Sequence, residues 1–139
     1  MRDIVMTVRA RHIRNMKKGV KGYELRHTCP VQAPVNRVWI CESGSGGRIV
    51  ASFKIGLIED MTASGDTTIA ELCAITPEEV AGYRKQGKGR LYGWLIEDFE
   101  YFKGTSRERH ITDFGLQRPP QSWCYAKSDE KITEGGERA

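Results

Sequence analysis

Apolar and β-branched residues along this chain concentrate in short runs, separated by polar segments that contain Gly and Pro. Such runs are typical of strands, which favour Val, Ile, Thr and aromatic side chains. They predict six strands, at residues 3–8, 20–28, 37–42, 48–58, 90–102 and 121–126, and a short extended segment at 111–115. The Gly-rich segment 43–47 predicts a hairpin turn between the third and fourth strands, since it fits no phosphate-binding glycine motif.

Two further segments follow helical spacing. Residues 10–18 place Ile13 and Met16 three apart among basic residues, which predicts a short amphipathic helix with a narrow apolar stripe. The run Thr-Pro-Glu-Glu at 76–79 is a capping box with Pro at the first helical position, so a second helix is expected from there to about residue 86. The apolar segment 69–75 fits either the start of a helix or a buried extended segment.

These elements predict an α+β domain. Five or six strands with two short flanking helices, in the order β-α-β-β-β-α-β-β, favour a small mixed β-barrel. A chain of 139 residues suits one domain, which we place at residues 1–126. Residues 127–139 are polar and Gly-containing, and we expect them to form a disordered tail.

The composition gives no sign of a membrane or secreted protein. Hydrophobic residues make up 39% of the chain, but no apolar run approaches the ~18–20 residues that span a bilayer. The N-terminus lacks the long apolar run of a signal peptide, so a cytoplasmic location is expected.

Cysteine and histidine spacing does not predict a metal site. The four cysteines lie in apolar or strand-like settings, and we expect them to be small, buried, reduced side chains: Cys29, Cys41, Cys73 and Cys124. Neither they nor the three histidines show the close ligand spacing of a zinc site. The sequence therefore predicts no metal and no cofactor.

Basic residues are concentrated near the N-terminus. Residues 1–27 contain eight Lys or Arg and only two Asp or Glu, although the net charge of the whole chain is only +4. Four of these side chains fall on or beside the first predicted helix and are candidates for nucleic-acid contacts: Arg11, Arg14, Lys17 and Lys18. The alternative is an ordinary solvated helix face.

A charged cluster is expected where the first helix gives way to the second strand. Residues two apart on a strand share a face, so Glu24 and Arg26 point the same way, with Lys21 at the mouth of the strand. The cluster is either part of a binding or catalytic site or simply three solvated charges at a strand entry.

Taken together, the motifs of the chain resemble the ASCH family, which belongs to the PUA-like β-barrel superfamily. Gly19-x-Lys21-x-x-Glu24-x-Arg26 is similar to the Gly-x-Lys-x-x-Glu-x-Arg motif of that family. Four further stretches resemble its strands: Val38–Ser43, Ile49–Phe53, Leu91–Ile96 and Pro119–Tyr125. The resemblance covers residues 3–126.

The resemblance implies a PUA-like barrel with a cleft between the first helix and the sheet that binds RNA or a nucleotide-like ligand. The ligand-binding residues expected from it are Lys21, Glu24, Arg26, Ser43, Ser122 and Trp123. Four aromatic residues are candidates for stacking on a base, and for each the alternative role is packing in the core: Tyr23, Trp94, Trp123 and Tyr125.

A hydrolase is the alternative function. Lys21 would act as nucleophile or electrostatic stabiliser and Glu24 as general base, on RNA or a modified nucleoside. One branch of the family hydrolyses acetylcytidine but carries Thr at the position of Glu24. A ribonucleolytic branch uses a Lys, a Tyr and a Ser, of which Lys21 and Ser122 are possible counterparts. The sequence leaves the ligand, any catalysis and the oligomeric state open.

Overall fold

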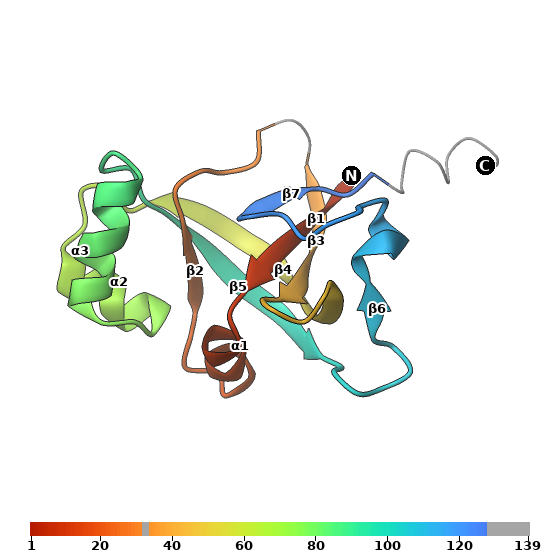
Figure 1. Ribbon diagram of the computed structural model, residues 1–139. Coiled ribbons are helices and arrows are strands. Elements are labelled where there is room, and N and C mark those ends of the chain that lie inside the picture. The colour runs from red at the N-terminus through yellow and green to blue at the C-terminus, as the bar shows by residue number, and fades with distance from the viewer. Residues whose placement is uncertain (32–33, 128–139) are drawn as a thin grey trace.

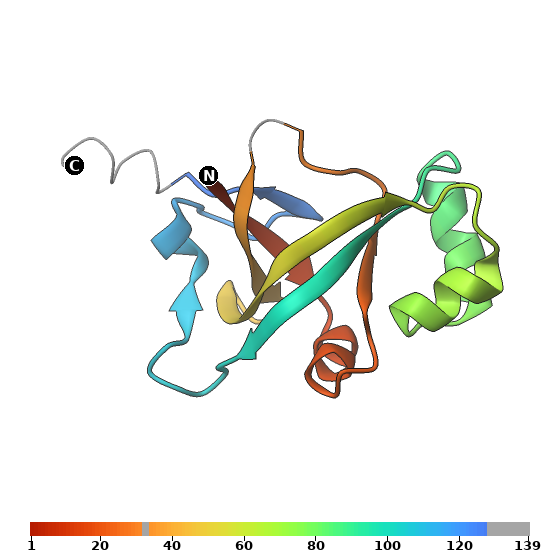
Figure 2. The same ribbon diagram turned by 180° about the vertical axis from the view of Figure 1, so that it is seen from behind.

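A mixed, curled β-sheet forms the body of the protein (Figures 1 and 2). The computed structural model describes residues 1–31 and 34–127. In this part of the chain the elements are β1 (Arg2–Val8), α1 (Ala10–Lys17), β2 (Tyr23–Arg26), β3 (Val35–Glu42), β4 (Arg48–Asp60), α2 (Asp66–Cys73), α3 (Pro77–Gln86), β5 (Tyr92–Tyr101), β6 (Arg109–His110), the 3-10 turn η1 (Ile111–Phe114) and β7 (Trp123–Tyr125).

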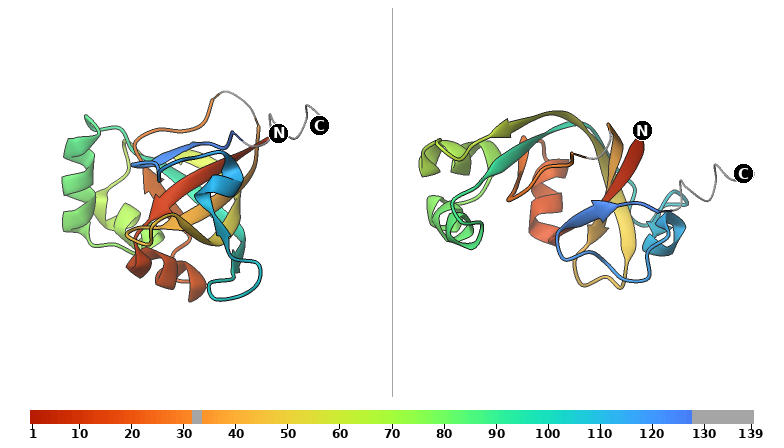
Figure 3. Two further views of the ribbon diagram at one scale, coloured as in Figure 1. Left: turned by 45° about the vertical axis from the view of Figure 1, so that its right-hand side comes forward. Right: turned by 90° about the horizontal axis from the view of Figure 1, so that it is seen from above.

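The strand order is β2-β5-β4-β3-β1-β7, with β6 pairing separately with β4. Only the β1–β3 pair is parallel, and the other described pairs are antiparallel. The sheet curls strongly, as Figure 3 shows from two directions, so its two end strands, β2 and β7, are tied together by side chains. The expected small α+β barrel is therefore confirmed, with its seam between β2 and β7.

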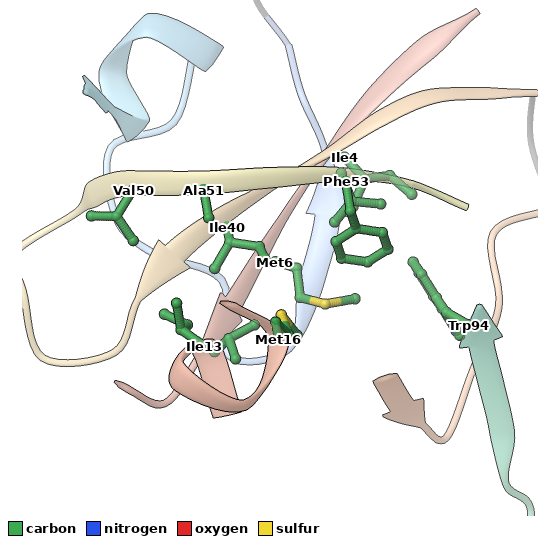
Figure 4. Close-up of a cluster of buried hydrophobic side chains, with 11 residues drawn as sticks. Ile4, Met6, Ile13, Met16, Ile40, Val50, Ala51, Phe53 and Trp94 are labelled. Atoms are coloured by element: carbon green, nitrogen blue, oxygen red, sulfur yellow. The ribbon is translucent and has the colours of Figure 1, made fainter. Parts of the chain in front are cut away.

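The main core lies inside the curl (Figure 4). Ile4 of β1, Phe53 of β4 and Trp94 of β5 are all fully buried there. The helix α1 packs against this cluster through Ile13 and Met16, so the narrow apolar stripe expected from the sequence is confirmed. The basic face of α1 is consequently turned outward.

The helices α2 and α3 form a pair at one end of the molecule, and β6 with η1 lies at the other end (Figures 1 and 2). A separate buried cluster, including Ile69, Val80 and Leu91, holds the pair against the sheet. The capping box at the start of α3 is present: the Thr76 hydroxyl accepts from the Glu79 N–H, and the Glu79 carboxylate accepts from the Thr76 N–H.

The described residues form three α-helices where two were expected. The undecided segment 69–75 belongs largely to α2, which begins at Asp66. Its first turn, Asp-Thr-Thr, is polar and carries no helix signal in the sequence. The helix is stabilised by tertiary packing, because Ile69 and Cys73 are buried between α3 and the sheet.

The prediction of an extended segment at 111–115 is wrong, because most of this segment forms the 3-10 turn η1. The His110 side chain accepts from the Thr112 N–H, and the Asp113 carboxylate accepts from the His110 N–H at 3.0 Å. A strand of two residues, β6, also lies within the stretch 103–110, for which no strand was predicted.

Of the expected tail, only Lys127 lies within the described residues. Among the helices of the described ranges, none is long and apolar enough to cross a membrane.

Candidate functional site

A pocket of about 510 Å³ opens between the β1–α1 junction, β2 and α3. Its lining comes mainly from the end of β1 and the start of α1, from β2 and the turn before it, and from α3. The lining residues are Thr7, Val8, Arg9, Arg11, His12, Lys21, Glu24, Leu25, Arg26, Ser43, Ile75, Glu79, Gly82, Tyr83, Gln86 and Gln121. The cleft expected beside the first helix therefore has a wall, α3, that the sequence did not indicate.

Three charged side chains converge at the base of this pocket. Lys21, Glu24 and Arg26 are 4%, 5% and 8% exposed, so the alternative of three solvated charges is wrong. Arg26 Nε and Nη2 donate to Glu24 Oε2 at 2.9 and 2.6 Å, and Lys21 Nζ lies 3.5 Å from Glu24 Oε1. The carboxylate therefore lies between two cations, and the expected shared face of Glu24 and Arg26 is confirmed.

The backbone places the cluster through the turn that follows α1. Gly19 has φ +78°, a conformation that favours glycine, and the N–H groups of Val20 and Lys21 both donate to the Asn15 carbonyl. The chain then enters β2, which pairs antiparallel with β5. Glu24 lies on the pocket face of β2, while Leu25 packs into the cluster beneath α2 and α3, so both faces of this strand are buried.

Lys21 is anchored from a second side. Its Nζ donates to the Cys73 carbonyl at 2.7 Å, at the end of α2. An ammonium group has three N–H donors, and the hydrogen bond to Cys73 directs one of them at a protein acceptor, while Glu24 Oε1 at 3.5 Å is an ion-pair partner and not a hydrogen-bond acceptor. The remaining donors are left for a pocket ligand or water.

Glu24 remains ionised in this setting. Burial raises the pKa of its carboxyl, but the charges of Arg26 and Lys21 and the Arg26 hydrogen bonds outweigh burial and hold the pKa below its usual value. Glu24 Oε1 accepts no hydrogen bond from the described residues. A buried carboxylate oxygen of this kind is a ready acceptor for a ligand donor.

His12 is a site residue that the sequence did not reveal. It lies on α1 and lines the pocket, and its buried Nδ1 has no hydrogen-bond partner among the described residues. Burial, helped by the nearby Lys21 charge, lowers its pKa to about 4. The imidazole is therefore neutral near pH 7. A lone histidine in a basic helix carries no sequence signal for this role, because its isolation depends on the fold.

Tyr83 and Glu79 of α3 were also missed, since they are more than 50 residues from β2 in sequence. The Tyr83 ring stacks on His27, with ring centroids 3.8 Å apart. Glu79 forms an ion pair with Arg11, which links α3 to α1 at the pocket. A hydrogen bond from Arg11 lowers the pKa of Glu79 to about 2, so its carboxyl group is ionised near pH 7.

Of the three other expected ligand-binding residues, one lines the pocket and two lie outside its lining. Ser43 lines it directly. Ser122 accepts a hydrogen bond from Arg26 Nη1 at 3.0 Å and lies outside the lining. Trp123 is also outside the lining: its ring packs edge-on against Trp94, and its Nε1 donates to Thr28 Oγ1.

Of the four basic residues expected to contact nucleic acid, Arg11 alone lines the pocket. Arg14, Lys17 and Lys18 are exposed on or just after α1, where Lys17 Nζ lies over the Tyr101 ring. Among the candidate stacking residues, Trp94 is fully buried in the core, so it is not available to a base.

The described residues contain no group of three His, Cys, Asp or Glu side chains placed to hold a metal ion. Instead, the pocket presents donors and acceptors side by side. The Lys21 ammonium and the Ser43 hydroxyl are donors, and Glu24 Oε1 and His12 Nδ1 are acceptors or sites for a ligand proton.

Comparison with known proteins identifies the fold. No protein-family model matches the sequence, and no curated protein matches it.

Solved structures of the ASCH protein of Zymomonas mobilis are similar to this chain. A serine-to-alanine variant is 14% identical with a TM-score of 0.72, covering 98% of this chain and 96% of that one. A tyrosine-to-phenylalanine variant is 15% identical with a TM-score of 0.71, covering 98% of each chain. A third structure of this ASCH protein is 14% identical with a TM-score of 0.68 and covers 97% of this chain and 94% of that one. The chain thus has an ASCH-domain fold, as its motifs indicated.

Proposed function

We propose that this protein binds single-stranded RNA and holds one nucleotide in the pocket between β2 and α3. The observation that carries the proposal is the pair of buried atoms Glu24 Oε1 and His12 Nδ1, which belong to two residues that line the pocket and which lack hydrogen bonds within the described chain. Buried polar atoms are almost always satisfied in folded proteins, so two beside one pocket point to a ligand that satisfies them.

The size and charge of the pocket support a nucleotide. Its volume of about 510 Å³ lies within the usual range of small-molecule sites, about 300–1,000 Å³. Four basic and two acidic side chains line it, which favours an anionic ligand. A nucleobase edge carries both donors and acceptors and so complements Glu24 beside Lys21. The ASCH-domain fold supports the same class of ligand.

The exposed basic residues of α1 extend the site outward. Arg14 on α1 and Lys18 at its C-terminal end face solvent, and the first turn of this helix lines the pocket. A strand with one nucleotide in the pocket can therefore place its flanking phosphates against them. Contacts of this kind position the strand and depend on salt without reading its sequence.

Binding of a fluorescently labelled single-stranded RNA to wild type and to Lys21→Met tests the proposal. Methionine has similar length but no charge or donor, so the proposal expects at least a tenfold loss of affinity. The matched control is Lys54→Met, which removes the same charge from an exposed position on β4. Equal affinities for the two variants, with Lys21→Met folded, would refute binding in this pocket.

A hydrolase is the second candidate, and His12 is the observation that favours it. The charges of Arg26 and Lys21 lower the pKa of Glu24, and the pKa of His12 is about 4, so both are weak bases near pH 7. The neutral imidazole of His12, whose Nδ1 has no partner among the described residues, can instead hold and orient an attacking water. Lys21 would then stabilise the negative charge that develops on the attacked group. Turnover of RNA or an acetylated nucleoside that is lost in His12→Gln while binding is kept would establish this function; absence of turnover in wild type leaves binding alone.

A further inference from the structure

A second cavity, of about 430 Å³, lies where β3 and the end of β5 meet the loop before β6. It is lined by Trp39, Phe102, Ser106, Arg107, Glu108, Arg109 and Asp113, and it shares no residue with the first pocket. The strand β6 is at the opposite end of the molecule from α3, so the two cavities are separate sites (Figure 1).

The Trp39 side chain lines this cavity, and its indole N–H differs from those of the other two tryptophans in lacking a hydrogen bond. Trp94 Nε1 donates to the Thr28 carbonyl at 3.2 Å, and Trp123 Nε1 donates to the Thr28 hydroxyl at 3.0 Å. Trp39 Nε1 is buried and has no acceptor among the described residues. An indole nitrogen can only donate, so the missing partner must be an acceptor.

Two guanidinium groups lie over the aromatic rings of the same cavity. The Arg109 guanidinium carbon is 5.5 Å from the centroid of Trp39, and that of Arg107 is 5.3 Å from the centroid of Phe102. A guanidinium that uses its face against a ring keeps its N–H groups free at the edge. Arg107 directs one of them to Glu100 at 2.7 Å, whereas Arg109 has no ion pair within the described ranges.

The two acidic residues of the cavity are engaged with neighbouring groups. Both oxygens of Glu108 accept from Arg48, at 2.6 and 2.9 Å, and Oε1 also accepts from the Gly104 N–H. Asp113 accepts from the His110 N–H at 3.0 Å. These carboxylates hold the loop and η1 in place, so the donor groups left for a ligand are those of Arg109, Arg107, Ser106 and Trp39.

We propose that this cavity binds a phosphate group, with the Arg109 edge and the Trp39 indole N–H as its principal donors. A phosphate offers several acceptor oxygens and matches the planar fork of arginine. The phosphate belongs either to a free nucleotide or to the backbone of an RNA strand. This site is independent of the function proposed for the first pocket.

The three tryptophan indoles allow a direct test by NMR. Adenosine monophosphate is titrated into ¹⁵N-labelled protein, with adenosine at the same concentrations and chloride at matched ionic strength as controls. The Trp39 indole N–H signal is expected to shift and to exchange more slowly with solvent, while the Trp94 and Trp123 indole signals serve as internal references. An RNA oligonucleotide without terminal phosphates forms the second arm.

The outcomes are distinct. A Trp39 shift with the mononucleotide alone identifies a free phosphate ester, and a shift with the oligonucleotide identifies a backbone phosphodiester. The exposed Arg109 is then replaced: Arg109→Ala is expected to reduce the phosphate affinity at least tenfold, and Arg90→Ala, an exposed control near α3, to leave it unchanged. No Trp39 shift in either arm, an equal shift with adenosine, or full affinity in Arg109→Ala would overturn the proposal.

Discussion

Arg26 donates through Nη1 to the Ser122 hydroxyl at 3.0 Å, which joins the strand at one end of the sheet to the segment that enters the strand at the other end. Its Nη2 also donates to the Thr7 carbonyl of β1 at 3.0 Å and to Glu24. One guanidinium therefore spans the seam of the barrel and fixes the carboxylate at the base of the pocket. In this protein the closure of the barrel and the shape of the site depend on the same side chain.

Replacing this side chain should therefore be costly to stability. Arg26→Ala is expected to lower the free energy of unfolding by about 3–5 kcal/mol, because it leaves Glu24 buried without its main partner. Urea unfolding followed by tryptophan fluorescence measures the change. The control is Arg14→Ala, an exposed residue of α1, which should change stability by no more than about 0.5 kcal/mol. Equal small effects for both variants would mean that Arg26 does not close the barrel.

Gly82 allows stability to be separated from binding. A methyl group at this position of α3 meets no atom within 4 Å, so Gly82→Ala should stabilise the helix by about 0.5–1 kcal/mol. Because Gly82 lines the pocket, the same methyl group is expected to weaken RNA binding. A more stable protein with unchanged affinity would exclude the α3 wall from the binding site.

Gly87, at the end of α3, is the contrasting position. A Cβ there would lie 2.1 Å from His27 Cδ2, so Gly87→Ala must displace the ring that stacks on Tyr83. The expected result is a lower midpoint of thermal unfolding than that of wild type, and hence a change opposite in sign to that of Gly82→Ala.

The pocket makes stability depend on pH. His12 has a pKa of about 4 in the folded protein, against an ordinary value of 6.5 for histidine. The unfolded chain therefore binds a proton that the folded chain does not bind between these values, and stability falls as the pH is lowered from 6.5 to about 4. Glu24, whose pKa is below 4.5, adds a further loss as the pH falls through 4.5 and below.

Urea unfolding at a series of pH values measures this dependence. His12→Gln should flatten the stability profile between pH 6.5 and 4.5, where Glu24 contributes little. The steeper part below pH 4.5 should remain. A His12→Gln profile parallel to that of wild type over the upper window would show that His12 is not held neutral by burial.

The exposed residues of α1 should affect binding through salt dependence. Each phosphate contact with a single strand contributes about 0.7 to the slope of log affinity against log salt concentration. Arg14→Ala and Lys18→Ala are expected to reduce the slope by about that amount each, and Lys54→Ala, on exposed β4, to leave it unchanged. Slopes identical to that of wild type would place the path of the RNA elsewhere.

Local patterns predicted the elements that depend on local chemistry. The stripe of Ile13 and Met16 gave α1, the capping box gave α3, and the β-branched runs gave the six longer strands. The elements η1 and β6 were not predicted, and α2 was left open between a helix and an extended segment, because tertiary contacts stabilise all three. The two residues of β6 are a strand only because they pair with Arg48 and Ile49 of β4.

The site was predictable only in part for the same reason. Glu24 and Arg26 are two residues apart on one strand, so their convergence follows from strand geometry. The contributions of His12, Glu79 and Tyr83 depend on how α1 and α3 approach β2, which no local pattern encodes. The burial of the cluster likewise depends on the whole fold and not on the sequence around Lys21.

The most direct test of the central claim is an NMR map of the protein with a single-stranded RNA. Amide signals of Thr7, Glu24 and Tyr83 come from β1, β2 and α3, three elements that all contribute lining residues to the first pocket. All three are expected to shift together with a single binding curve, and to stop shifting in Lys21→Met. Shifts confined to the exposed face of α1, with these three signals unchanged at saturation, would contradict nucleotide binding in the pocket.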